Sequence, residues 1–441
     1  MAMLNKLIGH LRFNKAKKAT PQVISLDIVP LSRFHFSREA ISHAALHVAK
    51  VLQDKGFKAF IVGGAVRDLI LSEKPKDFDI VTDALPEQVK RLFKRAQKIG
   101  RRFPIVHVYS GRELVEVSTF RQESAIFNEQ GRIIRDNCYG TIDMDAARRD
   151  FTCNALYLDP IAGTVHCYHH ALNHLKDKKL VLIGDPEIRF KEDPIRILRG
   201  IRISSKLNLS IDDQLMQTMQ KHAHLIDNEP MSRRFDELAK IIYSKHAYTC
   251  FTILIDTGLL SFVHPVTQIL LTYSQQAWIL IHRMLQQTDA RLQRNQHISL
   301  GFVVAAFLWP IAKTLWQQYM KEGLSPAHAM QQCLTDIHRH PIRQHIRQKI
   351  ITTVNEIWRL QNRLQYVKTK KQIDKIAGHP YFRAAYDFFL LRAESEDVDH
   401  DLAYCWQQLV EKNDFAPLLA TLPSTKQAKQ RRRSKRVKDH L

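Results

Sequence analysis

The sequence predicts an α+β protein with a small domain of mixed β-sheet and helices, followed by an elongated all-α region. Three observations support this class. Short apolar runs typical of buried strands lie ahead of residue 173 and alternate with helical patterns. From Pro194 to residue 420, apolar residues recur only at helical spacing. The chain then ends in a segment rich in Arg and Lys.

In the first region, apolar residues at helical spacing predict a helix that starts near Ser37 and ends at Gly56. Pro86 suits the first turn of a later helix, and Ser110-Gly111 suits a hairpin turn. In chain order we then expect a strand at 59–62, a helix at 65–71, a strand at 78–81, a helix at 87–96, and strands at 105–109 and 114–120.

The helical region is expected to open with a helix from Pro194 to about Leu207, with Asp193 as its N-cap. Because proline interrupts helices, we expect breaks at Pro310, Pro341 and Pro380. Further amphipathic stretches cover 213–223, 232–245, 247–259, 268–287 and much of 299–420.

Length and composition exclude several classes of protein. The 441 residues suggest about three domains at roughly 150 residues each. Hydrophobic residues make up 45% and charged residues 25%, which excludes a fibrous or wholly disordered chain. No run of about 18 apolar residues occurs, so we expect no transmembrane segment, and the N-terminal residues do not resemble a secretory signal. The six scattered cysteines predict reduced thiols and a cytoplasmic protein.

The net charge indicates a polyanionic partner. Lys and Arg number 66 against 44 Asp and Glu, which gives +22 and a pI near 9.7. Solubility alone would need far less charge. An excess of this size attracts polyanions, and we favour nucleic acid over an anionic membrane surface.

Two carboxylates in Lys76-Asp77-Phe78-Asp79 are candidate metal ligands. Residues two apart on a strand point to the same face, so Asp77 and Asp79 are expected to project together. Such a pair suits Mg²⁺, with phosphate oxygens completing its coordination. Alone the pattern is weak, and a solvated strand edge is the better interpretation of it.

The Gly63-Gly64 pair upstream makes the metal interpretation more specific. Two glycines between a strand and a helix let the backbone approach a phosphate, and the free N–H groups of the helix attract anions. Arg67 adds a positive charge. A tight strand-to-helix turn is the alternative for the glycines taken alone.

Two residues are candidates for a third carboxylate. Glu116 shares a strand face with Ser118, and Asp150 follows Arg148 and Arg149 just ahead of a predicted strand. Either could complete a metal site or orient an arginine, and the spacing does not rank them.

A second group of charged residues opens the helical region. Arg196 and Arg199 are three apart and share a helix face near Asp193. Ordinary capping and surface ion pairs would explain them. A guanidinium and a carboxylate could also read a base edge or hold a triphosphate.

Four motifs in this order resemble the class II template-independent nucleotidyltransferases of the DNA polymerase beta superfamily. They are Gly63-Gly64-x-Val66-Arg67-Asp68, Asp77-Phe78-Asp79, Arg148-Arg149-Asp150-Phe151-Thr152-x-Asn154 and Glu192-Asp193-Pro194-x-Arg196-x-Leu198-Arg199. The segments Gly100-Arg101-Arg102-Phe103-x-x-x-His107-Val108 and His379-Pro380-Tyr381-Phe382-Arg383 are similar to the bacterial poly(A) polymerase branch rather than the CCA-adding branch.

The resemblance implies five segments. They are a basic, flexible N-terminal arm at 1–33, a nucleotidyltransferase head at 34–173, a helical neck at 174–265 with nucleotide-selecting and RNA-binding elements, a helical body at 266–420, and a disordered Arg/Lys-rich tail at 421–441.

The resemblance also implies roles for the site residues. ATP would be the substrate, with two Mg²⁺ ions, or Mn²⁺ in their place, on Asp77 and Asp79. Asp150 would act at the active site, with Glu116 as second choice. The triphosphate would be held by Gly63, Gly64, Arg67 and Arg149, and the base would face Asp193, Arg196 and Arg199. RNA 3′ ends would be held, with no DNA specificity, by Arg101, Arg102, Arg431, Arg432, Arg433, Lys435 and Arg436.

This chain departs from the family at one turn. A Gly-Gly-x-x-Asp turn is usual where it carries His170, Ala171 and His174, within a histidine-rich run that begins at His166. We expect a replaced turn with exposed histidines, with a transition-metal site as the alternative. The chain is expected to add poly(A). The alternatives are CCA or A addition to tRNA and a non-catalytic RNA-binding protein on the same scaffold.

Overall fold

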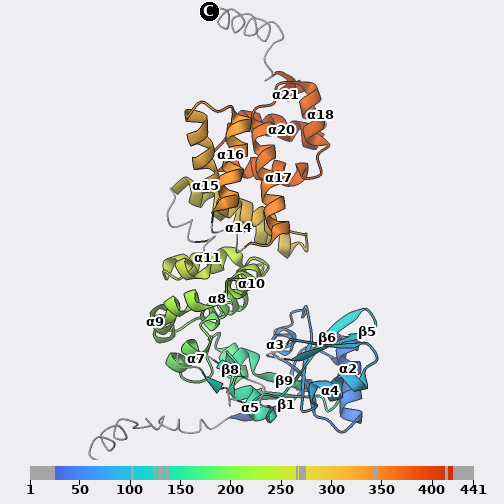
Figure 1. Ribbon diagram of the computed structural model, residues 1–441. Helices are drawn as coiled ribbons and strands as arrows, with labels where there is room; N and C mark the ends of the chain where they lie inside the picture. The colour runs from blue at the N-terminus through green and yellow to red at the C-terminus, as the bar shows by residue number, and fades with distance from the viewer. Residues whose placement is uncertain are drawn as a thin grey trace, which may run out of the picture. The chain divides into compact units, whose positions relative to one another are not determined.

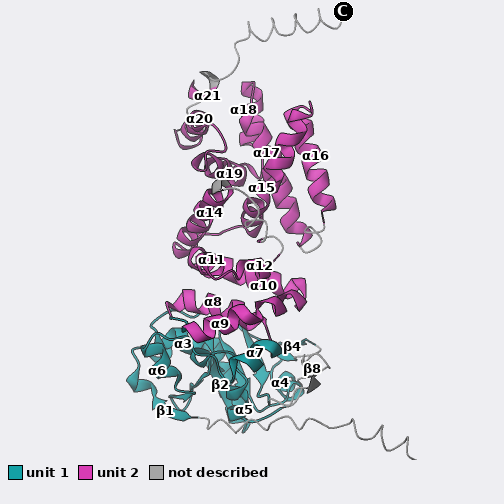
Figure 2. Ribbon diagram, turned by 90° about the vertical axis from the view of Figure 1, so that its left-hand side faces the viewer, with its two compact units in different colours: residues 1–192, 210–212 teal, residues 193–209, 213–441 magenta. Residues whose placement is uncertain are grey.

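The computed structural model describes residues 25–100, 104–122, 126–127, 133–135, 139–264, 267, 275–340, 346–412 and 416–420. The chain divides into two compact units, one of residues 1–192 with 210–212 and one of residues 193–209 with 213–441 (Figures 1 and 2). The predicted α+β class is confirmed, since the first unit holds the sheet and the second is helical. The expected N-terminal arm is wrong for residues 26–30, and the other expected segments stay predictions.

An eight-stranded mixed sheet forms the first unit, in the order β1-β10-β9-β2-β3-β6-β5-β4. Its strands pair antiparallel except for β3 and β6, which run parallel. The bounds are β1 Leu26–Pro30, β2 Ala59–Val62, β3 Asp79–Thr82, β4 Ala96–Ile99, β5 Ile105–Ser110, β6 Glu113–Thr119, β9 Leu156–Asp159 and β10 Thr164–Tyr168; a separate pair is β7 Ile126–Phe127 and β8 Ile133–Arg135.

Short helices cover the sheet. Helix α2, capped by Ser42, contacts β2, β3, β5 and β6 with its buried side. A core that includes Phe60, Val81 and Tyr157 from the strands also takes in Ala146 of α5. The helices of this unit are α2 His43–Asp54, α3 Gly64–Ile70, α4 Pro86–Leu92, α5 Ile142–Ala147, α6 Ala171–Lys176 and α7 Pro186–Glu192.

Two sequence-based predictions for this unit are wrong. Residues 26–30, expected in a flexible arm, form β1 and pair with β10; residues 1–24 lie outside the described part. The helix expected to reach residue 96 ends at Leu92, and 96–99 form β4 instead. Pairing with β5 explains this strand, because tertiary pairing overrides the weak local preference of a basic stretch.

The second unit is helical throughout its described residues (Figure 2). Its longer helices are α8 Ile195–Leu207, α9 Asp213–His222, α10 Met231–Ile242, α11 Ala247–Asp256, α14 Gln275–Gln293, α15 Leu300–Lys321, α16 Pro326–Arg339, α17 Gln348–Gln365, α18 Lys370–Ala377, α19 Phe382–Glu394 and α20 His400–Lys412; the shorter α12 and α21 span Leu260–Val263 and Ala416–Ala420. The expected break at Pro380 is confirmed between α18 and α19, and Pro341 lies outside the described residues.

The break expected at Pro310 is wrong, because this residue lies inside the continuous helix α15. Most of the residues around it are buried, and α15 packs against α16 and α17. Burial of the helix on several sides offsets the loss of the one backbone hydrogen bond that proline cannot donate. Among the described residues, α15 is also the one helix long and apolar enough to cross a membrane by length and composition, although 61% of that stretch is buried inside the protein.

Candidate active site

A row of paired residues crosses five strands on one face of the sheet. Tyr157 of β9 pairs with Val62 of β2, and Val62 pairs with Asp79 of β3. Asp79 pairs with Glu116 of β6, and Glu116 pairs with His107 of β5. Paired residues on neighbouring strands point to the same side of a sheet, so the Asp79 and Glu116 carboxylates are neighbours. Glu116 Oε1 lies 3.3 Å from His107 Nε2.

Asp79 has an unusual electrostatic environment. Surrounding protein reduces its hydration, and this raises the pKa of Asp79 to about 6, although solvent still reaches the side chain. Glu116 adds to the rise, Arg149 opposes it, and Asp77 contributes a smaller increase. Because a divalent cation relieves repulsion between such carboxylates, the donor set fits a hard cation such as Mg²⁺.

Asp77 lies just ahead of β3 and not on it, contrary to the expectation of a shared strand. Pro75 and a bend at Lys76 delay the start of the strand to Asp79. The Asp77 side chain is 76% exposed and lies 4.0 Å from Lys76 Nζ. Over the described ranges, no three His, Cys, Asp or Glu side chains form a ready metal-holding group. Two carboxylates with substrate phosphate oxygens are nevertheless a usual Mg²⁺ shell.

Gly63 adopts a backbone conformation that requires glycine. Its φ of 72° and ψ of −129° are accessible to glycine and strained for other residues. A Cβ atom at Gly63 would lie 3.4 Å from a guanidinium nitrogen of Arg149. The glycine turn therefore brings bare backbone next to a positive charge at the start of α3.

Arg149 belongs to a buried cluster that sequence reasoning missed. Its Nε donates to the Tyr157 hydroxyl at 2.7 Å, and a terminal nitrogen donates to Asp145 Oδ2 at 3.0 Å. The Tyr157 hydroxyl in turn donates to Asp145 Oδ2 at 2.8 Å. Burial alone would raise the pKa of Asp145, but Arg149 and Arg148 lower it. The cluster thus fixes a charged guanidinium beside the glycine turn.

Asp150 and Arg67 meet at Asn154 instead of at the carboxylate pair. Asp150 Oδ1 accepts from Asn154 Nδ2 at 3.0 Å, and Asn154 Oδ1 accepts from Arg67 at 2.7 Å. Arg67 is buried and also donates to Asp68 Oδ1 at 2.7 Å. These contacts give Asp150 and Arg67 the geometry of residues that position others.

Asp193, Arg196 and Arg199 lie at the start of α8 in the second unit. The N-cap position of α8 is held by Pro194 and not by Asp193 as expected, but Asp193 Oδ1 still accepts from the Ile195 backbone N–H at 3.2 Å. Its other oxygen accepts from Arg233 of α10 at 2.7 Å. Arg233 is a further residue that spacing did not reveal, since it is far along the chain.

The histidine-rich segment is a turn, as expected. His169 and His170 both have φ of 54°, a region that glycine enters more readily, and His170 precedes α6. Of the histidines in this run, only His170 is exposed. His174 is half-buried, with Nδ1 3.1 Å from Thr152 Oγ1, so the expectation of exposed histidines holds only in part.

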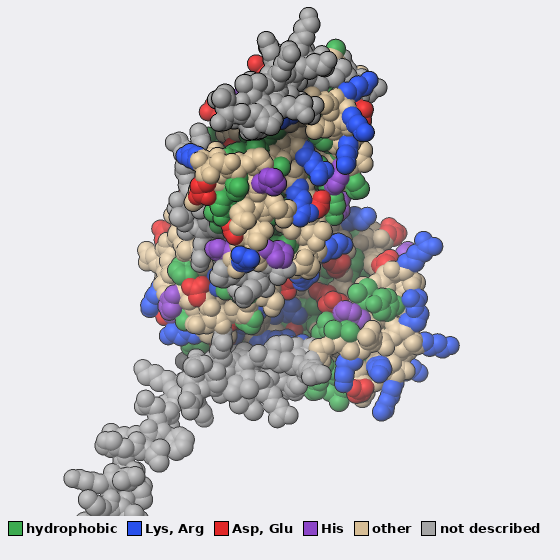
Figure 3. Space-filling model, turned by 45° about the horizontal axis from the view of Figure 1, so that its top comes forward, with side chains coloured by type: hydrophobic (Ala, Val, Ile, Leu, Met, Phe, Trp, Pro, Cys, Tyr) green, Lys and Arg blue, Asp and Glu red, His purple; other side chains and the backbone are tan. Residues whose placement is uncertain are grey.

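The expected RNA-binding residues lie outside the described residues: Arg101, Arg102, Arg431, Arg432, Arg433, Lys435 and Arg436. On the face drawn in Figure 3, other Lys and Arg side chains are spread over the surface and are not gathered at one spot.

Adjacent carboxylates on a mixed sheet beside a glycine turn suit nucleotidyl transfer, and the chain falls in the class of nucleotidyltransferases. Residues 59–181 match the Poly A polymerase head domain, 208–270 the "probable RNA and SrmB-binding site of polymerase A", and 322–438 the polymerase A arginine-rich C-terminus. The chain is 35% identical to Poly(A) polymerase I of Escherichia coli O6:H1 over 391 residues, covering 86% of this chain and 83% of the relative. The protein belongs to the poly(A) polymerase family and is an enzyme that adds AMP without a template.

Other relatives extend the comparison. Poly(A) polymerase I of Haemophilus influenzae is 35% identical over 399 residues, 87% of each chain. A CCA-adding enzyme of Streptococcus uberis is 39% identical, but over only 45% of this chain and 48% of the relative. A solved tRNA nucleotidyltransferase, in complex with primer tRNA and an ATP analog, shares the fold at a TM-score of 0.56 and 19% identity, covering 83% of this chain and 98% of that one.

Proposed function

We propose that this protein transfers AMP from ATP to the 3′-hydroxyl of RNA and releases pyrophosphate. The proposal rests on the adjacency of Asp79 and Glu116 in the head. Two neighbouring carboxylates would hold metal ions that assist in-line attack of the RNA hydroxyl on the α-phosphorus. RNA as substrate is supported by the similarity of residues 208–270 to a probable RNA-binding site. The buried free cysteines Cys153, Cys167, Cys250, Cys333 and Cys405 support a cytoplasmic location.

Asp77, Asp79 and Glu116 would hold the divalent cations. Mg²⁺, or Mn²⁺ in its place, would activate the attacking hydroxyl and neutralise the leaving pyrophosphate. We place Glu116 ahead of Asp150 as the third carboxylate, because Glu116 is the register partner of Asp79 while Asp150 Oδ1 accepts hydrogen bonds from Phe151 N and Asn154. His107, 3.3 Å from Glu116, orients that carboxylate.

The remaining residues would bind the substrates. Gly63 and Gly64 let the triphosphate approach the backbone, and Arg149 beside them supplies a charge held by Asp145. Arg67 supports this turn from behind through Asp68 and Asn154. Asp193, Arg196 and Arg199 are proposed to face the base, and the basic surface is proposed to hold RNA phosphates without DNA specificity, so binding weakens as salt rises.

An extension assay tests this function. Full-length protein with Mg²⁺ receives a generic RNA or a tRNA that lacks its CCA end, together with one nucleoside triphosphate at a time. We expect long ladders with ATP on generic RNA, and none from Asp79→Asn, which should still bind RNA. Addition of a few nucleotides to tRNA with use of CTP would place the protein in the CCA-adding branch. No extension of either RNA would overturn the catalytic assignment.

A further inference from the structure

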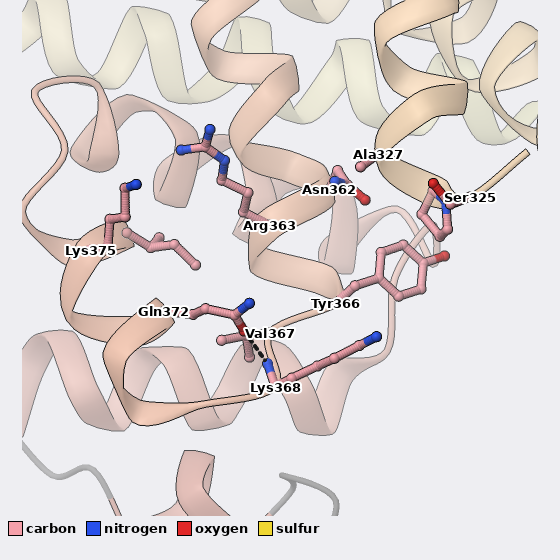
Figure 4. A pocket seen from close by; sticks show the side chains of 11 residues that line it. Ser325, Ala327, Asn362, Arg363, Tyr366, Val367, Lys368, Gln372 and Lys375 are labelled. Atoms are coloured by element: carbon pink, nitrogen blue, oxygen red, sulfur yellow. Dashed lines mark hydrogen bonds between the residues drawn. The ribbon is translucent and has the colours of Figure 1, made fainter. Parts of the chain in front are cut away.

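A pocket in the second unit lies apart from every residue assigned above. Its volume is about 540 Å³, within the usual range of about 300–1,000 Å³ for small-molecule sites. It is built from the end of α17, the middle and end of α18, the loop between these helices and the start of α16 (Figure 4). No substrate, metal or base contact has been assigned to it.

The charge of this pocket favours an anion. Its lining includes Arg363, Lys368 and Lys375 and no Asp or Glu. The ion pairs within the described ranges do not engage any of these three cations, in contrast to Arg359 one turn earlier, which pairs with Glu356 at 2.8 Å. Unpaired cations lining one pocket create a positive potential that suits phosphate.

An aromatic ring and an amide line the same pocket. Tyr366 is 39% exposed, and its ring is held edge-on against Trp316 at a centroid distance of 6.2 Å and an angle of 85°. Asn362 Oδ1 is buried and accepts no hydrogen bond from any described residue. Figure 4 shows Tyr366, Asn362 and Ser325 toward one end of the pocket and Arg363 and Lys375 toward the other.

We propose that this pocket binds one adenine nucleotide of an RNA strand, outside the active site. The base stacks on Tyr366, and the amide of Asn362 meets the adenine edge, where Nδ2 donates to a ring nitrogen. Arg363 and Lys375 contact the adjoining phosphates. The proposal depends on the proposed function in one respect, namely that the bound nucleotide belongs to RNA. A nucleotide bound here would give the product strand a second anchor that retains a growing poly(A) tail.

Equilibrium binding of labelled oligo(A) and oligo(U) to the full chain tests the proposal. Tyr366→Leu should weaken oligo(A) binding by roughly 5- to 100-fold, while Tyr366→Phe keeps the stacking ring and binds as wild type. Asn362→Leu should remove the preference for oligo(A) over oligo(U). The double variant Arg363→Gln/Lys375→Gln should reduce the salt slope by about 1.4, since each phosphate contact to a single strand contributes about 0.7.

The matched control is Lys321→Gln/Lys349→Gln, which removes the same charge from exposed positions of this unit outside the pocket. Equal slopes for the two double variants would overturn the proposal, as would wild-type oligo(A) affinity in Tyr366→Leu. Oligo(A) carrying 8-azidoadenosine should crosslink to the tryptic peptide 364–368. Competition by ATP as strong as by oligo(A) would assign the pocket to free nucleotide.

These readouts separate the pocket from the active site. Binding and crosslinking do not need catalysis, so Asp79→Asn should give the wild-type crosslink while adding no AMP. If the protein adds no AMP to RNA, so that the proposed function is wrong, the crosslink should still form. Loss of the crosslink in a chain that still adds AMP would remove the pocket proposal alone.

Discussion

Asp79 of β3 and Glu116 of β6 are register partners in the parallel pair of strands of the sheet. Loss of hydration raises the pKa of Asp79 most, and this pairing adds to the rise, because the second carboxylate is held beside Asp79 by backbone hydrogen bonds and not by a flexible loop. A cation bound by this pair would therefore find two carboxylate ligands already positioned by the sheet.

Glu116→Gln should lower AMP addition far more than Asp150→Asn, because Glu116 is the register partner of Asp79. We expect a loss of roughly 10²-fold or more for Glu116→Gln, with a higher Mg²⁺ requirement. Asp150→Asn should act on the KM for ATP through Asn154 and Arg67. Rates over a Mg²⁺ titration measure both variants, and the reverse ranking would restore Asp150 as the third carboxylate.

Asp79→Asn should stabilise the folded protein at neutral pH while it abolishes catalysis. The pKa of Asp79 rises on folding from 3.8 to about 6, so the wild type loses stability as pH rises through that window. Above pH 6 the gain in the free energy of unfolding should be about 1 kcal/mol, because solvent screens the exposed side chain. Near pH 4 the folded wild type is protonated at this position, so the gain should vanish. Urea unfolding at both pH values measures it. In the double variant Asp79→Asn/Glu116→Gln, the stability gains of the two single substitutions should not add, because the two residues are neighbours.

Gly63→Ala should lower both stability and ATP binding. Its φ of 72° and ψ of −129° disfavour alanine, and the new Cβ would lie 3.4 Å from Arg149. We expect a cost of about 1–3 kcal/mol and a higher KM for ATP. Gly111→Ala is the control, because φ there is 63° with nothing within 4 Å, so its backbone strain should leave the KM unchanged.

Tyr157→Phe should destabilise the head and weaken ATP binding. Removal of the hydroxyl leaves Arg149 Nε without its acceptor and takes one of several donors from the buried Asp145 carboxylate. A loss of about 1–3 kcal/mol in the free energy of unfolding is expected. Tyr168→Phe removes a comparable contact, to Asp143, so equal effects of both variants on ATP binding would contradict a specific role for the cluster.

Local patterns predicted most of the head. The Ala59–Val62 strand is entirely buried, and the glycines after it form the turn that their conformational freedom suggested. The helix predicted after Pro86, however, is longer than helix α4 in the structure. Residues 96–99 form β4 and pair with β5 instead, and such long-range pairing is hard to predict from a basic stretch of sequence.

The site was harder to read from the sequence. The Asp77-x-Asp79 pattern indicated carboxylates, but period-two spacing misplaced Asp77, because the strand begins after it. Ranking Glu116 against Asp150 requires the order of strands β3 and β6, which spacing does not encode. Asp145 and Tyr157 are recognisable only once folding brings them to Arg149.

Strand β1 also sets the minimum length of a stable head. The match to the head-domain family begins at residue 59, yet Leu26–Pro30 pair with all of β10 and supply one edge of the sheet. A fragment that starts after Pro30 would leave Thr164–Tyr168 with unpaired backbone N–H and C=O groups beside the buried side chains of Val165 and Cys167. Without β1 this unpaired edge lies beside buried apolar side chains, so such a fragment should self-associate more readily than the full chain.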